Sequence, residues 1–128
     1  MIKPQHESRT YFRVSFQNPL QFLICSSNLL SELHVANSQN VSQSGICFLS
    51  RTKPPLGSIL KIQTDLKTLA SCIRVENMLF ELEGSVLGKV VWARPSQKES
   101  DWFDVGVAFI KLEEAQNHEV REAIELLA

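Results

Sequence analysis

The sequence predicts an all-β domain, either a closed antiparallel barrel or a small sandwich, followed by one C-terminal helix. About seven short runs alternate apolar and polar residues with the period of a strand, and turn residues separate several of them. The last segment changes to the period of a helix. A closed barrel is favoured because closure leaves no strand edge exposed. The 128 residues suit one domain, and 44% hydrophobic residues is an ordinary globular composition.

The N-terminal elements are an arm and a strand. Residues 1–11 are polar and without periodicity, so we expect a flexible arm in front of a barrel domain spanning 12–128. The first strand is predicted from Phe12 to Phe16, with Arg13 facing outward because side chains alternate along a strand. The other predicted strands show the same alternation and centre on residues 33–35, 46–49, 60–62, 80–82, 90–92 and 105–109.

Two features refine these elements. Within the run GKVVWAR, the period of two puts Val90 and Trp92 on the same face. From residue 112 onward, apolar residues recur every three to five positions and charges fill the remaining face. This spacing predicts an amphipathic helix of about four turns, whose apolar stripe we expect to close one end of the barrel. A helix that binds a partner protein is the alternative. The apolar positions are Leu112, Ala115, Val120, Ala123, Ile124 and Leu127.

Several classes of protein are disfavoured by composition. The net charge of −1 argues against broad nucleic-acid binding, so no DNA partner is expected. No apolar run approaches the ~20 residues of a membrane span, and the N-terminus lacks the apolar core of a secretory signal. We therefore expect a cytoplasmic protein. The cysteines, an odd number without paired spacing, indicate small buried side chains and no disulfide or zinc site; they are Cys25, Cys47 and Cys72.

Catalysis is not expected either. His6, His34 and His118 lie in dissimilar contexts, and no Cys/His or Ser/His/Asp arrangement or metal cluster is evident. The sequence therefore predicts neither an enzyme nor a cofactor. The charge distribution is more informative than its sum. Residues 1–74 carry eight Lys/Arg against three Asp/Glu, whereas residues 75–128 carry five against eleven. A basic surplus in the first half fits a local anion site.

That basic half holds two short motifs. The first is RxxxR, from Arg9 to Arg13, at the entry to the first strand. The second is NxSxxG, from Asn40 to Gly45, in front of the strand run GICFLS. The second motif also has a plain structural interpretation, in which Asn and Ser cap backbone groups and Gly supplies a positive φ. Downstream follow GKVVWARP and then DVGVAF.

In this combination and order, the sequence resembles the PilZ family of bacterial cyclic di-GMP receptors, over about residues 9–127. The resemblance implies a six- or seven-stranded antiparallel barrel with a C-terminal α-helix. It also implies that Arg9 and Arg13 contact phosphate and guanine, and that the turn holds base and phosphate through Asn40, Ser42 and Gly45. The function expected is that of a cyclic di-GMP effector that signals to an unidentified protein partner. An interaction adaptor with weak or no nucleotide binding is the alternative.

Two further residues have open roles. Trp92 either stacks on guanine, as an aromatic at this place does in some relatives, or fills the core beside Val90. Arg94 either adds a donor to the site or is a solvated surface charge. The sequence also departs from common family members in two places. Asn40 stands where aspartate is frequent, which offers guanine one acceptor fewer. Ser8 stands where some members carry another arginine, which favours one ligand per chain.

Overall fold

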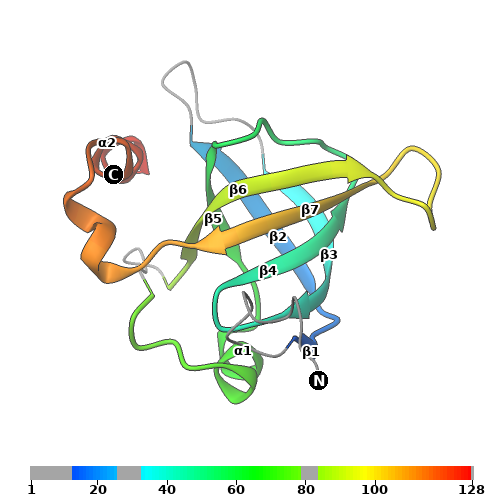
Figure 1. Cartoon of the computed structure of the whole chain (residues 1–128), viewed down its shortest axis with the longest axis horizontal. Coiled ribbons are helices and arrows are strands. Elements are labelled where there is room, and N and C mark those ends of the chain that lie inside the picture. Colours follow the sequence, from blue (N-terminus) through cyan, green and yellow to red (C-terminus); the bar gives the residue numbers. More distant parts are fainter. Residues whose placement is uncertain (1–12, 26–32, 79–83, 128) are drawn as a thin grey trace, which may run out of the picture.

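The computed structural model describes residues 13–25, 33–78 and 84–127, and within them six strands close into an antiparallel barrel (Figure 1). Around the barrel the order is β3-β2-β5-β6-β7-β4, and pairing of β3 with β4 closes it. A seventh, two-residue strand, β1, pairs with the end of β3. The predicted fold class is confirmed. The strands are β1 (Val14–Ser15), β2 (Pro19–Cys25), β3 (His34–Val41), β4 (Gly45–Ser50), β5 (Ile59–Gln63), β6 (Val86–Pro95) and β7 (Phe103–Phe109).

Strand β2 is not predicted by the sequence pattern, and β1 and β3 lie at other bounds than predicted. Strand β2 reads PLQFLIC, a run with little alternation, yet it pairs with both β3 and β5. The first strand is shorter than predicted, because β1 ends at Ser15. Val14 is exposed, whereas Phe16, whose N–H donates to the Gln39 carbonyl, is buried. In β3 the apolar alternation of the run at 33–35 does not mark the inward face. Val35 is 69% exposed, and the inward positions hold the smaller Ala36 and Ser38.

The barrel interior is one apolar cluster, and an unpredicted helix covers its end. Helix α1 (Leu66–Cys72) lies between β5 and β6. Leu69, Ile73 and Met78, on and after α1, belong to the same buried cluster as the inward side chains of the strands. Figure 1 places α1 at one end of the barrel. Burial of these side chains supplies the closure that sequence analysis assigns to the C-terminal helix.

The C-terminal segment packs on the outside of the barrel, so its predicted place at the barrel end is wrong. Val120 and Ala123 form a separate cluster with Ile59, Leu87 and Ile110. Ile59 and Leu87 point outward because their neighbours in β5 and β6 fill the interior. Figure 1 shows this helix beside the barrel wall.

The predicted single helix is two helical segments. A 3-10 helix, η2 (Leu112–Gln116), precedes α2 (His118–Leu127), and Asn117 between them has an extended backbone. The Glu114 side chain accepts a hydrogen bond from the Lys111 N–H at 2.8 Å, which caps η2. The Asn117 carbonyl then starts α2 by accepting from Arg121 N–H.

Some predictions lie outside the described residues: the arm 1–11 with Arg9, the position of Phe12 and the strand at 80–82. Within the described part, no helix is long and apolar enough to cross a membrane. Cys47 is buried, whereas Cys25 and Cys72 are half-buried, and all three are free thiols. Burial raises the pKa of Cys25 to about 11, so this thiol stays protonated and behaves as a small apolar side chain.

Candidate functional site

A row of cross-strand neighbours runs over the outside of the barrel where β3, β4, β7 and β6 are adjacent. Asn40 on β3 pairs with Cys47 on β4. Gly106 on β7 pairs with Cys47 on one side and with Trp92 on β6 on the other. These side chains share the outer face, because the residues before and after Cys47 belong to the core.

Two β-bulges flank this row. The pairing register shifts in β3 between Ser38 and Asn40, and in β6 between Val90 and Trp92. Each bulge inserts one residue, and a shift of one residue moves the following side chains to the opposite face. Val90 is therefore 1% exposed in the core, while Trp92 lies on the outside. The prediction that both share a face is wrong, and with it the interpretation of Trp92 as core filling.

Glycine determines where the Trp92 ring lies. A Cβ atom on Gly106 would stand 2.2 Å from Trp92 Cε2, so the ring packs directly on the glycine backbone. Gly106 is not among the predicted site residues, although it stands in the DVGVAF run. A glycine is needed at position 45 for a reason other than the positive φ that the motif predicts. Its φ is not positive, but a Cβ there would stand 2.2 Å from the Val107 carbonyl oxygen, which the pairing of β4 with β7 forbids.

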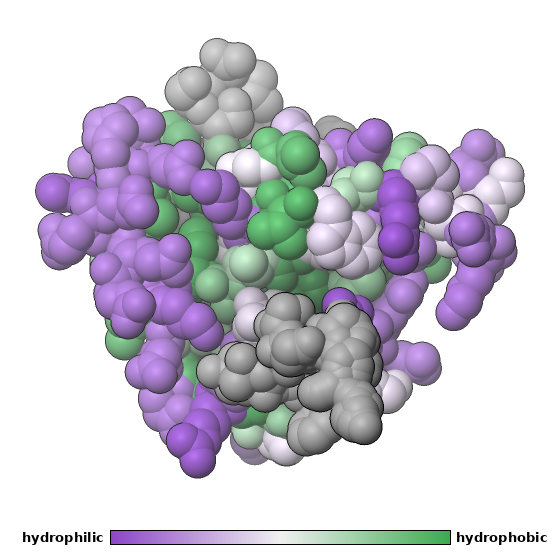
Figure 2. Space-filling view, in the orientation of Figure 1, coloured by the Kyte–Doolittle hydropathy of each residue, from purple (hydrophilic) through white to green (hydrophobic). Residues whose placement is uncertain are grey.

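Small side chains on this face leave a groove of about 150 Å³. Its walls come from the turn between β3 and β4 on one side and from β6 on the other. Figure 2 shows the same face, with hydrophobic surface gathered over β6 and β7 between hydrophilic regions. The groove is lined by Arg13, Asn40, Ser42, Ser44, Gly45, Ile46, Cys47, Val91, Trp92, Gly106, Val107 and Ala108.

Positive charge stands at both walls. Arg13 is exposed, as predicted, and its Nη1 donates a hydrogen bond to Asn40 Oδ1 at 3.4 Å. On β6, the guanidinium carbon of Arg94 lies 4.8 Å from the centroid of the Trp92 ring, a cation–π contact. Burial and the charge of Asp104 raise the pKa of Cys47 on the groove floor, while Arg13 and Arg94 both act to lower it. Both arginines thus act electrostatically on the floor of the groove.

The turn between β3 and β4 is closed by its own backbone. Ser42 and Gly45 exchange N–H to carbonyl hydrogen bonds at 2.8 and 3.3 Å. The hydroxyl of Ser42 lies 3.1 Å from that of Ser44 and accepts from the Ser44 N–H. The NxSxxG motif thus forms a compact hairpin turn at the rim of the groove, with hydroxyl groups beside Arg13 and Asn40.

Of the predicted site residues, the structure brings five together around this groove: Arg13, Asn40, Ser42, Gly45 and Trp92. Arg94 is beside them through its contact with Trp92. Arg9 lies outside the described residues. Among the residues described, no group of three or more His, Cys, Asp or Glu is placed to hold a metal ion.

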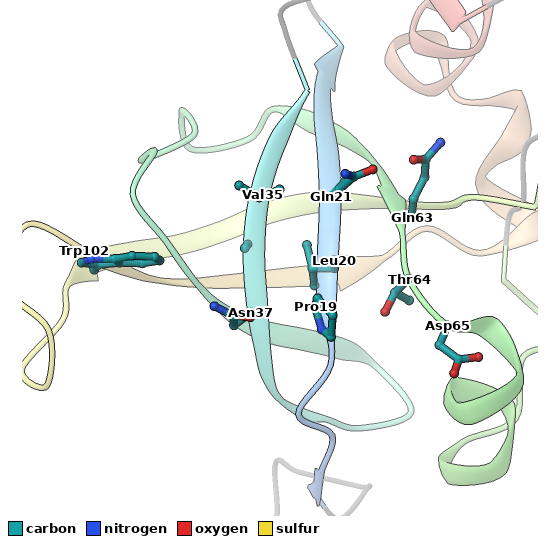
Figure 3. Close-up of a pocket in the computed structure, with 10 residues that line it drawn as sticks. Pro19, Leu20, Gln21, Val35, Asn37, Gln63, Thr64, Asp65 and Trp102 are labelled. Atoms are coloured by element: carbon teal, nitrogen blue, oxygen red, sulfur yellow. The ribbon is translucent and has the colours of Figure 1, made fainter.

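A larger hollow, of about 460 Å³, lies on the opposite side of the barrel along β2 and β3 (Figure 3). We call it the β2–β3 groove. Its polar groups are amides, a threonine hydroxyl and the carboxylate of Asp65, and no Lys or Arg belongs to its described lining. Such a lining does not attract an anion. Its residues are Pro19, Leu20, Gln21, Val35, Ala36, Asn37, Gln63, Thr64, Asp65 and Trp102.

Comparison with solved structures finds similar chains at low identity. One is MrkH from K. pneumonia, solved as a complex with c-di-GMP, with a TM-score of 0.48 and 9% identity. It is matched over 98% of this chain and 53% of its own, so this chain spans about half its length. Another is the PilZ domain of YcgR from Escherichia coli with c-di-GMP, with a TM-score of 0.47 and 13% identity over 93% of this chain and 88% of that one. A search of curated proteins gave no match.

Fold and groove define a small β-barrel domain with a basic-rimmed hollow on its outer face. The family follows from the sequence itself, because the family model of the PilZ domain matches residues 7–126, nearly the whole chain. This chain belongs to the PilZ domain family, and the resemblance carried by the two motifs is confirmed. PilZ domains are in general ligand-binding receptor domains and not enzymes.

Proposed function

We propose that this chain is a receptor module that binds cyclic di-GMP in the groove between the β3–β4 turn and Trp92. One observation carries the proposal: the fold puts Arg13, hydrogen-bonded to Asn40, on one wall of the groove and Trp92, stacked with Arg94, on the other. These residues lie far apart in the sequence. Membership of the PilZ family supports the same ligand.

The chemistry of the rim suits such a ligand. Cyclic di-GMP carries two phosphates and two guanines. Guanine offers adjacent N7 and O6 acceptors to a guanidinium fork, and phosphate accepts charge-assisted hydrogen bonds from arginine. Arg13 donates one N–H to the amide of Asn40 and carries further N–H donors suited to either group. The Trp92 ring, which rests on the backbone of Gly106, offers an aromatic surface on which a base can stack.

The first motif arginine completes the site in this proposal. Residues four apart in a straight strand are ~13 Å apart, so Arg9 and Arg13 converge on one ligand only if the chain bends between them. We infer that the arm 1–11 closes over the ligand and that this closure changes the surface offered to a protein partner in the cytoplasm. The cost of ordering, ~1–2 kcal/mol of backbone entropy per residue, limits the ordered part to a few residues around Arg9.

Isothermal titration calorimetry with cyclic di-GMP tests the proposal, with GMP and cyclic di-AMP as controls. We expect saturable binding of cyclic di-GMP with one ligand per chain, and weaker binding of both controls. A stoichiometry of two would contradict the single-ligand site that Ser8 favours. No measurable binding of cyclic di-GMP would leave the alternative, an adaptor that acts through protein contact alone.

A further inference from the structure

Gln43 contacts a part of the molecule away from the groove. It lies between Ser42 and Ser44 in the β3–β4 turn but does not line the groove. Its Oε1 accepts a hydrogen bond from the Arg74 N–H at 2.8 Å, and its Nε2 donates to the Arg74 carbonyl. One side chain therefore satisfies both backbone groups of a residue 31 positions further along the chain.

The segment that Gln43 holds is anchored in the core. Arg74 directly follows Ile73, which ends α1 and packs with the barrel interior. Four residues later, Met78 is 1% exposed in the same cluster and pairs with Lys111 in an isolated β-bridge. Because both ends of residues 73–78 are buried, Arg74 is a fixed point against which the turn is held.

A second contact ties the turn to the C-terminal segment. Lys111 Nζ donates to the Gln43 carbonyl at 3.3 Å. The backbone N–H of Lys111 is bonded to Glu114, the contact that caps η2. The neighbouring carbonyl of Ser44 accepts from the Phe109 N–H at 2.9 Å. The turn thus has the groove on one side and, on the other, contacts to Arg74 after α1, to Phe109 of β7 and to Lys111 before η2.

We propose that Gln43 is a positioning residue that holds the Ser42–Gly45 turn in its binding geometry and couples it to residues 73–78 and 111–116. The inference rests on the proposed function and names the route by which that site reports a bound ligand. A ligand that draws the turn toward Arg13 must move Arg74 and Lys111 or break their bonds to Gln43. Ligand binding in the groove then changes the surface around the end of α1 and the start of η2.

A purely structural role predicts something different. The Gln43–Arg74 contact is exposed, and such bonds contribute little to global stability. If it only ties two loops together, its removal lowers the melting temperature slightly and leaves the response to ligand unchanged. If it positions and couples, its removal lowers affinity and cuts the response at residues 73–78, while global stability hardly changes.

The experiment combines cyclic di-GMP calorimetry with amide hydrogen exchange in the presence and absence of ligand. Gln43→Met keeps the length of the side chain and removes both bonds to Arg74. Lys111→Met removes only the Nζ contact. Gln63→Met is the matched control, because Gln63 lines the β2–β3 groove on the opposite side of the barrel. Melting temperatures of all variants check that the fold is kept.

We expect Gln43→Met to weaken cyclic di-GMP binding roughly three- to tenfold. This is the effect expected when one or two hydrogen bonds that hold the turn in its binding geometry are lost. The ligand-dependent change in exchange at residues 73–78 should disappear. Lys111→Met should abolish the change at residues 111–116 and keep that at 73–78, and Gln63→Met should match the unmodified protein. Affinity within twofold together with an unchanged exchange response in Gln43→Met overturns the inference.

The two proposals fail in different ways. If the unmodified protein does not bind cyclic di-GMP, the proposed function fails. The role of the Gln43–Arg74 contact is then tested in the free protein. There Gln43→Met must accelerate hydrogen exchange of the Arg74 amide, and Gln63→Met must not. Unchanged exchange at Arg74 would overturn the inference whatever the ligand.

Discussion

Among the described residues the barrel carries two arginine–tryptophan contacts, one on each side, and only one of them belongs to the candidate site. Arg94 lies 4.8 Å from the centroid of Trp92 beside the groove on β4, β7 and β6. Arg51 lies 5.3 Å from the centroid of Trp102, which lines the larger β2–β3 groove. The pairs are nearly equal in geometry, so the contact by itself does not mark a binding site.

The surroundings make the difference. Near Trp92 there is a second arginine, Arg13, a hairpin turn with hydroxyl groups, and a glycine that lets the ring lie flat on the sheet. The lining of the β2–β3 groove contributes amides and the carboxylate of Asp65. The smaller hollow is therefore the one whose own lining includes an arginine, Arg13, together with serine hydroxyls that can meet a phosphate. In this choice the chemistry of the rim counts for more than volume.

The largest effect should come from Arg13→Ala. A bidentate arginine contact to guanine is worth ~1–3 kcal/mol, so we expect cyclic di-GMP binding to weaken by more than tenfold. The fold should survive because Arg13 is exposed. Arg51→Ala, on the other side of the barrel, is the control and should bind like the unmodified protein. Equal affinity of the two variants, measured by calorimetry, would remove Arg13 from the site. The groove beside Trp92 would then no longer be preferred to the β2–β3 groove as the binding site.

A smaller effect is expected from Trp92→Ala. Stacking of a base on an aromatic ring contributes ~1–3 kcal/mol, and we expect the lower half of this range, about tenfold in affinity, because Arg94 remains available to the ligand. Trp102→Ala should change affinity less than twofold. Fluorescence quenching by the ligand separates the two tryptophans: the signal should be lost in Trp92→Ala and kept in Trp102→Ala. The reverse pattern would place the ligand at the β2–β3 groove.

The smallest effect should come from Asn40→Asp. A carboxylate adds an acceptor for the guanine edge and pairs more strongly with Arg13, which donates to this position. We expect a gain in affinity of less than tenfold, measured by the same titration. Asn37→Asp, on the β2–β3 side of the same strand, is the control. A loss of more than tenfold in Asn40→Asp would show that this position faces phosphate.

The sequence by itself determined the architecture and the family. In β4, β5 and β7 every second residue is a large apolar side chain of the barrel interior, so these runs could be predicted as strands. The two motifs and the downstream runs GKVVWARP and DVGVAF are local in sequence, and their combination and order carried the PilZ resemblance. Strand β2 was not predicted because PLQFLIC hardly alternates. Helix α1 was not predicted because seven residues give too few turns for a helical period.

Tertiary structure alone decided how the site is assembled. The bulge between Val90 and Trp92 moves the tryptophan off the face of Val90 to the outside, and a period of two does not reveal an inserted residue. The placement of Gly106 under the ring and the bonds of Gln43 to Arg74 depend on which strands and loops become neighbours. The same holds for α2, whose apolar stripe is visible in the sequence. Its place against Ile59 and Leu87, and not at a barrel end, depends on the apolar side chains that β5 and β6 present on the outer wall.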